Sequence, residues 1–213
     1  MTTTAAEKVV NGVDAGRLFQ TITAIEQDPA IAKFNFRLSN FWVHGAHNRA
    51  VVADFDGART THRRDKTYFV YDKDEHPALL GEDRGANPVE YLLAGLAGCV
   101  TTTLVYHAAA RGITLTRVDA ELDGDIDLRG LLGMSEEVRP GYQSIRMTLH
   151  VEGDASREEL ADLVRLAERR SPVADVVMHG TPLRLTLADQ DGNKGGPPKK
   201  NIPAQETSER GAR

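Results

Sequence analysis

The spacing of apolar residues predicts an alternation of strands and helices along the chain. Between Lys33 and His44 apolar residues occupy every second position and then slip in phase at Phe41 and Trp42, which indicates a strand with a bulge. Similar alternation predicts strands at residues 50–55, 67–71, 115–128, 142–151 and 181–187. Apolar residues three or four apart predict helices at residues 14–27, 157–170 and 172–178, the last two opened by serine N-caps. We expect a turn at residues 56–57, loops at 72–86 and 129–141, and fraying of 1–13.

The longest apolar stretch runs from Asn87 to Gly112 and predicts a central helix. Pro88 suits the first helical position, and Gly112 suits the left-handed residue that often ends a helix. No charged residue lies between Tyr91 and Ala110, so we expect a helix that is buried on all sides. The only cysteine of the chain, Cys99, lies at the middle of this helix.

The same stretch is long enough for a membrane span, which needs about 20 apolar residues. Two glycines, three consecutive threonines and His107 lower its apolar character, and acidic residues are abundant on both sides of it. A positive-inside arrangement would instead place Lys and Arg on one side. We therefore favour a central helix and expect no membrane partner.

Composition narrows the class of protein. A chain of 213 residues with 40% apolar content can bury one sizeable core. The net charge of −5 argues against nucleic acid as a partner, because a phosphate-binding surface needs an excess of basic residues. A single cysteine excludes an internal disulfide and suits a reducing cytoplasm, and the first residues show no secretory signal pattern. No Cys/His spacing is typical of a zinc site, so we expect neither a metal nor a cofactor.

A row of carboxylates follows one face of the predicted strand 115–128. The row consists of Asp119, Glu121, Asp123, Asp125 and Asp127. A calcium site is one interpretation, but side chains on one strand face lie about 6 to 7 Å apart and cannot converge on one ion. We instead expect a solvated face, paired with Arg146 and His150 across the sheet.

The segment NPVEYLLAGLAGC at residues 87–99, followed by Ser171-Pro172-Val173, resembles the OsmC family of osmotically induced and organic hydroperoxide resistance proteins. The order of predicted strands and helices fits the same family. The resemblance covers roughly residues 49–188 and leaves an N-terminal extension, residues 1–48, and a tail, residues 189–213. The tail is rich in Gly, Pro and charge, so we expect it to be disordered. The resemblance implies an α+β fold in which antiparallel sheets wrap around the long buried central helices of an intertwined homodimer.

The resemblance also implies thiol peroxidase chemistry at Cys99. In that chemistry the cysteine attacks a hydroperoxide, becomes a sulfenic acid and releases an alcohol; a second cysteine then condenses with it, and an external dithiol restores both. At the position of the second cysteine this chain has Ser171. An oxidised Cys99 would therefore need an outside thiol or a cysteine of another chain.

A reactive Cys99 also needs a nearby cation. Cysteine reacts as its thiolate, which apolar surroundings disfavour, and Cys99 lies too far from the start of its helix for the dipole to help. The resemblance implies an arginine from the N-terminal strands. Arg59 is our first candidate and Arg49 our second, although either could be a surface arginine instead.

Two further residues of the central helix are candidates for supporting roles. In the branch of the family that is specialised for hydroperoxides, the resemblance implies a glutamate that holds the arginine. This chain has Val89 at the position of that glutamate. Glu90 comes one residue later and lies on the opposite side of the helix from Cys99, so we interpret it as a first-turn carboxylate rather than a catalytic group. His107 lies about 12 Å along the axis from Cys99, too far for a pair within one chain unless a dimer mate brings it closer.

Three hypotheses follow. The first is a cytoplasmic, homodimeric, OsmC-like hydroperoxide reductase that acts through Cys99 with an external thiol as reductant. The second is a redox-inactive dimer of the same fold that binds a small hydrophobic or thiol-bearing ligand, with Cys99 as an inert apolar residue. The third, a cysteine-dependent hydrolase or acyl transferase, lacks a base unless the dimer supplies His107.

Overall fold

The computed structural model describes residues 9–64 and 68–188. The chain divides into two compact units, residues 1–181 and residues 182–213. The tail that we expected to be disordered, residues 189–213, lies outside the described residues, as does Thr67 at the start of a predicted strand.

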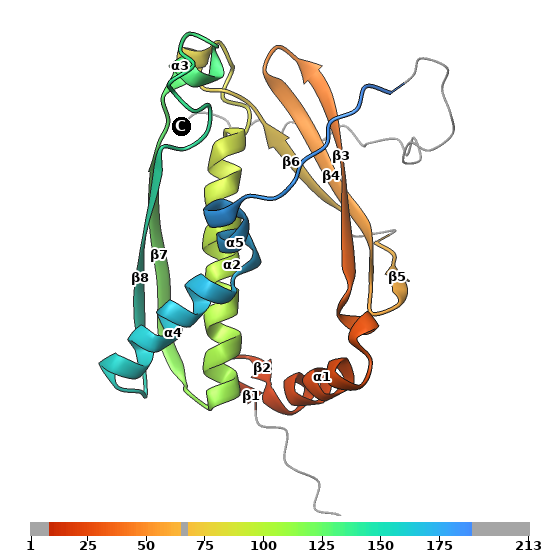
Figure 1. Ribbon diagram of the computed structural model, residues 1–213, viewed down its shortest axis with the longest axis vertical. Helices are drawn as coiled ribbons and strands as arrows, with labels where there is room; N and C mark the ends of the chain where they lie inside the picture. The colour runs from red at the N-terminus through yellow and green to blue at the C-terminus, as the bar shows by residue number, and fades with distance from the viewer. Residues whose placement is uncertain (1–8, 65–67, 189–213) are drawn as a thin grey trace, which may run out of the picture. The chain divides into compact units, whose positions relative to one another are not determined.

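The first unit has a mixed α+β architecture with antiparallel sheets (Figure 1). Its strands are β1 Val9–Val10, β2 Val13–Asp14, β3 Phe34–His44, β4 His47–Gly57, β5 Thr60–His62, β6 Phe69–Lys73, β7 Leu115–Asp125 and β8 Ser144–Gly153. Its α-helices are α1 Ala15–Gln27, α2 Pro88–Arg111, α3 Leu128–Leu131, α4 Arg157–Arg170 and α5 Pro172–His179, and two short 3-10 helices span Pro29–Ala32 and Pro77–Leu79. The predicted helices and most of the predicted strands are confirmed, whereas β1, β2, β5 and α3 were not predicted.

Strands β3, β4, β5 and β6 form one antiparallel sheet, in which β3 pairs with one edge of β4 and both β5 and β6 pair with the other. The β3–β4 register shifts between Phe36 and Leu38 and again between Trp42 and His44. An irregularity in this strand is confirmed, but it follows Trp42 instead of lying at Phe41 and Trp42, and the shift after Phe36 was not predicted. The turn predicted at residues 56–57 was wrong by two positions. Gly57 still belongs to β4, where the ring of Phe34 leaves no space for a Cβ, and the chain reverses at Ala58 and Arg59 with φ of 48° and 62°.

The main core lies where α2, α4 and α5 pack on the β7–β8 pair (Figure 1). Leu104 and Ala108 of α2 meet Leu163 and Ala167 of α4, and all four are fully buried. The alternating residues of β8 that we expected to face inward pack against this cluster; they are Ile145, Met147, Leu149 and Val151. The apolar faces of α2, α4 and α5 therefore pack against one face of the β7–β8 pair and form a single two-layer core.

The N-terminal residues are more ordered than we expected. Residues 9–14 form the β1–β2 hairpin, with Asn11 and Gly12 in left-handed conformations at the turn. The amide of Asn11 donates to the Ile113 carbonyl at 2.9 Å and accepts from the Leu115 N–H at 2.8 Å. This pair of hydrogen bonds joins the hairpin to the connection between α2 and β7. The predicted fraying of residues 1–13 was therefore wrong for residues 9–13, and residues 1–8 lie outside the described residues.

The carboxylate row on β7 is paired as a surface face. The guanidinium of Arg146 binds both Asp123 and Asp125, and His150 Nε2 lies 3.8 Å from Glu121. These side chains are exposed, so the prediction of a solvated, cross-strand paired face is confirmed for Glu121, Asp123 and Asp125. The predicted strand was too long at its end, because β7 stops at Asp125, and Asp127 instead caps α3 and pairs with Arg129.

Helix α2 is not buried on all sides within one chain. Leu104 and Ala108 are fully buried, but Leu92, Gly95, Gly98, Thr102 and Tyr106 form an exposed stripe at helical spacing. Among the described residues, α2 is the single helix long and apolar enough to cross a membrane, and 28% of its most apolar window is buried. The prediction of a helix buried on all sides was therefore wrong for a single chain. The sequence shows that α2 carries no charge along most of its length, but it does not show which of its apolar faces other parts of the chain cover.

The strand predicted at residues 181–187 does not form. Leu183, Leu185 and Leu187 are 80%, 89% and 94% exposed, and residues 181–188 have no regular structure. Alternation alone does not make a strand, because the backbone groups also need a paired neighbour.

Candidate functional site

The start of α2 is fixed by a capping box. The Asn87 side chain accepts from the Val89 N–H at 2.9 Å, and the Glu90 carboxylate accepts from the Asn87 N–H at 2.8 Å. The Asn87 amide also donates to Glu75 of the preceding loop. Glu90 therefore serves the helix terminus, as the sequence indicated for a first-turn carboxylate.

Cys99 lies about three turns after the start of α2 and is partly exposed. Its carbonyl accepts from the Thr103 hydroxyl at 2.8 Å, which fixes the neighbouring side chain rather than the thiol. Within residues 9–64 and 68–188, no hydrogen bond to the sulfur of Cys99 is formed. Cys99 is thus partly exposed, and no cation of the described residues is in hydrogen-bond contact with its sulfur.

The exposed stripe of α2 lies beside Cys99. Gly95 lies four residues before the cysteine and Gly98 one residue before it. A Cβ atom added at either glycine would have no atom within 4 Å. Tyr106, on the same side of the helix, is half exposed. This side of α2 can therefore admit a second helix or a ligand close to the backbone next to the thiol.

The first candidate arginine, Arg59, is held at the β4–β5 turn. Its guanidinium pairs with Asp28 at 2.8 Å, and its side chain is 64% exposed. This ion pair is the largest cause of the lowered pKa of Asp28. Exposed pairs of this kind are weak, so Arg59 can be drawn away at little cost.

The second candidate, Arg49, is held more firmly on β4. Its Nε and Nη2 donate to the two oxygens of Asp72 on β6, at 2.8 and 3.0 Å, and His47 Nε2 lies 2.8 Å from the same carboxylate. The Asp72 carbonyl also accepts from the hydroxyl of Tyr91 on α2 at 2.9 Å. The hydrogen bonds from Arg49 lower the pKa of Asp72 and raise that of Arg49, so both groups are charged over a wide pH range.

A protein-family model matches the part of the chain that contains Cys99. The model of OsmC-like protein matches residues 81–186, which include α2, Cys99 and the α4–α5 junction. Residues 81–186 are an OsmC-like domain. No curated protein matches the chain.

Solved structures of OsmC-like proteins have the same fold. An OsmC-like protein from Mycoplasma pneumoniae is 17% identical with a TM-score of 0.54, over 68% of this chain and 88% of that one. A putative osmotic stress induced and detoxification response protein from Psychrobacter arcticus is 12% identical with a TM-score of 0.50, over 67% and 88%. An organic hydroperoxide resistance protein from Legionella pneumophila is 16% identical with a TM-score of 0.46, over 68% and 90%. At these identities the likeness to the Mycoplasma and Psychrobacter structures concerns the fold alone.

Ser171 has a structural role in the OsmC-like domain. It is fully buried, its N–H donates to the Ala167 carbonyl at 2.9 Å to end α4, and its hydroxyl accepts from the Ala174 N–H at 3.3 Å to begin α5. The predicted N-cap is confirmed. A serine hydroxyl cannot form a disulfide, so this domain has no second thiol at the α4–α5 junction.

His107 lies in a partly buried, positively charged part of the OsmC-like domain. Burial lowers its pKa, and the charges of Arg111 and Arg170 lower it further. In the described residues no hydrogen bond or ion pair links Cys99 with Arg49, Arg59, Glu90, His107 or Ser171. One chain therefore does not assemble the candidate residues into a catalytic group.

The sequence did not indicate a third arginine near an aromatic surface. The guanidinium carbon of Arg64 lies 5.0 Å from the ring centre of Phe55 and 5.2 Å from that of Phe69. The rings of Phe36 and Phe55 stack at 5.2 Å, and Phe36 is 71% exposed. No local pattern could reveal this cluster, because it depends on the register between β3, β4 and β6.

Proposed function

We propose that this protein is a homodimeric, thiol-dependent hydroperoxide reductase that acts through Cys99. The observation that carries the proposal is an OsmC-like domain whose only cysteine lies partly exposed beside the open glycine stripe of α2. The substrate is a small organic hydroperoxide and the reductant an external thiol. The single cysteine is consistent with a reducing cytoplasm, where we place the protein.

The reaction balances without a second protein sulfur. The Cys99 thiolate attacks the terminal oxygen of ROOH, the O–O bond breaks, and ROH leaves after the alkoxide takes a proton. The resulting sulfenic acid condenses with an external thiol to give a mixed disulfide and water. A second external thiol then attacks the mixed disulfide, which restores Cys99 and releases the oxidised reductant.

The cation that stabilises the thiolate is expected to come from the partner subunit. The apolar stripe of α2 and the aromatic surface formed by Phe34, Phe36 and Phe69 are both exposed in one chain, which supports an extensive dimer interface. Arg59, the most loosely held of the sequence candidates, is our first choice for this cation. Arg49 is the second, and Arg64, which lies on the aromatic surface, is the third.

The proposal is tested by comparing wild type with Cys99→Ser. We expect wild type to gain the mass of one oxygen on Cys99 after one equivalent of an organic hydroperoxide, and to turn over the peroxide when a dithiol is added. Cys99→Ser should do neither, while Ser171→Ala should keep both activities. Equal, slow peroxide consumption by wild type and Cys99→Ser would overturn the proposal.

A second candidate function is a redox-inactive dimer that binds a small hydrophobic or thiol-bearing ligand beside α2. It is favoured by the absence of any cation in contact with the Cys99 sulfur in the described residues, and by Val89 at the position where the resemblance implies a glutamate. Native mass spectrometry of freshly purified protein distinguishes the two candidates. A retained ligand with an unreactive thiol supports the second, and a ligand-free dimer with a peroxide-reactive thiol supports the first.

A further inference from the structure

The side chain of Asn11 joins the β1–β2 hairpin to the connection between α2 and β7. Its amide nitrogen donates to the Ile113 carbonyl at 2.9 Å, and its amide oxygen accepts from the Leu115 N–H at 2.8 Å. Each strand of the hairpin has two residues, and Val10 is only 6% exposed. A two-stranded hairpin is marginally stable by itself, so the Asn11 amide and the burial of Val10 keep it closed.

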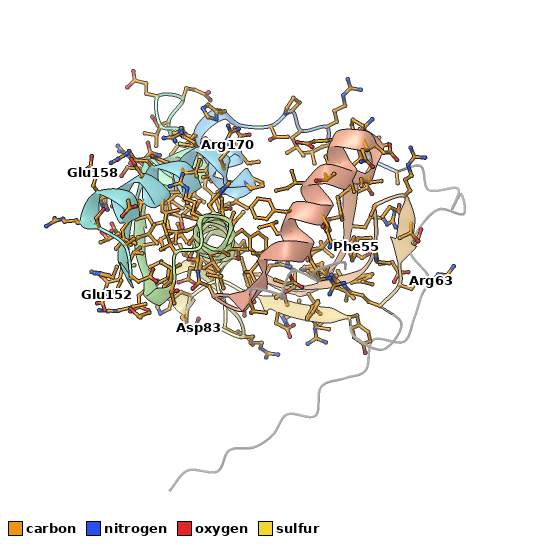
Figure 2. The ribbon with its side chains drawn as sticks, turned by 90° about the horizontal axis from the view of Figure 1, so that it is seen from below. Phe55, Arg63, Asp83, Glu152, Glu158 and Arg170 are labelled. Atoms are coloured by element: carbon orange, nitrogen blue, oxygen red, sulfur yellow. The ribbon has the colours of Figure 1, made fainter. Side chains whose placement is uncertain are left out.

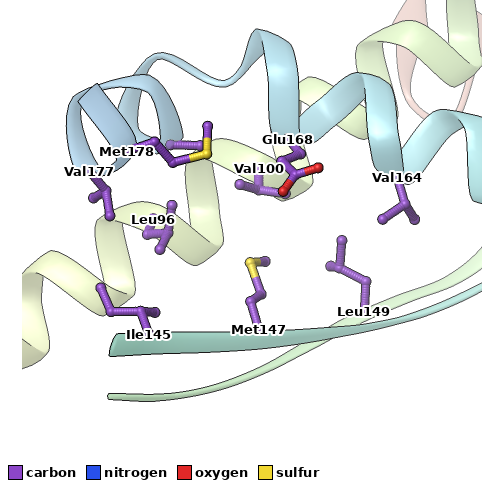
Figure 3. A pocket seen from close by; sticks show the side chains of 10 residues that line it. Leu96, Val100, Ile145, Met147, Leu149, Val164, Glu168, Val177 and Met178 are labelled. Carbon is purple, nitrogen blue, oxygen red and sulfur yellow. The ribbon is translucent and has the colours of Figure 1, made fainter. Parts of the chain in front are cut away.

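Residues 9–27 lie outside the main core. None of them belongs to the hydrophobic cluster between α2, α4, α5 and β8, part of which Figure 3 shows. Helix α1 leads away from α2, as the view along α2 in Figure 2 shows, and its Phe19 and Ile22 are 51% and 42% exposed. Segments with few buried contacts open at a lower free energy than the core. The hairpin can therefore open while the core stays folded.

Asn11 is followed by Gly12, and this dipeptide has two consequences. It favours the tight turn of the hairpin, in which φ is 55° at Asn11 and 76° at Gly12. It also lets the Gly12 backbone nitrogen approach the side-chain carbonyl carbon of Asn11, because glycine has no Cβ to obstruct the approach. In the closed hairpin two hydrogen bonds hold the Asn11 amide against residues 113–115, so this attack requires that they break.

We propose that Asn11-Gly12 is a site of spontaneous deamidation, which reacts when the hairpin opens and then prevents it from closing. The Gly12 nitrogen bonds to Cγ of Asn11, the bond from Cγ to the amide nitrogen breaks, and ammonia leaves with the proton of the Gly12 N–H. Water then opens the five-membered ring to aspartate or isoaspartate.

Neither product can restore the contact with residues 113–115. An ionised aspartate only accepts hydrogen bonds, so one of its oxygens would face the Ile113 carbonyl without a proton between them. Isoaspartate adds one carbon to the main chain and changes the two-residue turn. Deamidation would therefore convert a reversible opening of the N-terminal hairpin into a permanent one.

The first experiment measures deamidation of the full chain at mildly alkaline pH, by peptide mapping with mass spectrometry. We expect the reaction at Asn11 to be slower by about tenfold or more in native buffer than in guanidinium chloride, because only the opened hairpin reacts. Val10→Ser should speed it several-fold in native buffer and leave the rate in guanidinium chloride unchanged. The matched control is Val9→Ser, because Val9 is 61% exposed, and this variant should react as wild type does.

The second experiment measures the consequence with Asn11→Asp, which carries the aspartate product. Trypsin should cleave it after Arg17 in α1 several-fold faster than wild type. Asn40→Asp makes the same change on an exposed position of β3 and should be cleaved after Arg17 at the wild-type rate. Equal deamidation at Asn11 in native and denaturing buffer, no deamidation in either, or unchanged cleavage of Asn11→Asp would overturn the proposal.

Discussion

Arg49 and Asp72 lie opposite each other on β4 and β6 and form a two-point ion pair, with N–O distances of 2.8 and 3.0 Å. Their side chains are only 23% and 21% exposed, so water screens the pair incompletely. The Asp72 carboxylate also contacts His47 Nε2, and the backbone carbonyl of Asp72 accepts a hydrogen bond from the Tyr91 hydroxyl. The pair therefore ties the sheet to the beginning of the helix that carries Cys99.

Replacing Asp72 should test this connection. Asp72→Asn removes a charge-assisted pair and should lower the free energy of unfolding at pH 7 by about 1.5 to 3 kcal/mol. Because the pKa of Asp72 is lowered in the folded protein, its contribution is complete above the unfolded value near 3.9 and is lost as pH falls through the lower folded value. Urea unfolding at pH 7 and at pH 3 should therefore show a smaller difference between wild type and variant at pH 3.

The matched control is Asp123→Asn, which breaks the pair with Arg146 on an exposed strand face. Exposed pairs contribute little, so its effect should stay below about 1 kcal/mol at either pH. Equal losses for the two variants at pH 7 would show that the position of the Arg49–Asp72 pair confers no special stability.

His107 should make stability depend on pH near neutrality. Its folded pKa is lowered by burial and by Arg111 and Arg170, so the unfolded chain binds the proton more readily. The free energy of unfolding should fall as pH drops below the unfolded value of about 6.5. His107→Gln should show a shallower fall between pH 7 and pH 5 in urea unfolding. Parallel curves for wild type and variant would contradict the assignment.

Ser171 should matter for stability and not for turnover. Ser171→Ala removes the N-cap of α5 and should cost about 1 kcal/mol in chemical unfolding, with unchanged peroxide consumption. Ser171→Cys supplies sulfur at the position that the family resemblance assigns to a second cysteine. One equivalent of peroxide should then convert it to an internal disulfide, seen as the loss of two hydrogens by mass spectrometry. A lasting sulfenic acid in Ser171→Cys would show that the two positions do not meet.

Gly98 should report on the proposed dimer. Within one chain a larger side chain at Gly98 meets open space, and leucine favours a helix over glycine by about 1 kcal/mol, so Gly98→Leu should not unfold the chain. In the dimer the leucine would obstruct the glycine stripe, and we expect analytical ultracentrifugation to show dissociation to monomers. Glu158→Leu adds the same side chain on the exposed side of α4 and should leave the assembly unchanged. An intact dimer of Gly98→Leu would place the interface elsewhere.

The sequence by itself determined the elements whose signals are local. The capping boxes at Asn87 and Ser156, proline at the first position of α2 and α5, and Gly112 as the left-handed end of α2 fix helix boundaries through hydrogen bonds within a few residues. The alternation in β8 likewise fixed its buried face, because successive side chains of a strand point to opposite sides.

Only the tertiary structure decided which apolar surfaces are covered and which charges meet. The exposed stripe of α2 and the exposed leucines of residues 182–188 have the same composition as buried segments, so the sequence could not separate them. The contacts of Arg49 with Asp72 and of Arg64 with Phe55 and Phe69 depend on strand register and nonlocal packing. Register joins residues far apart in the chain, and no local pattern specifies it.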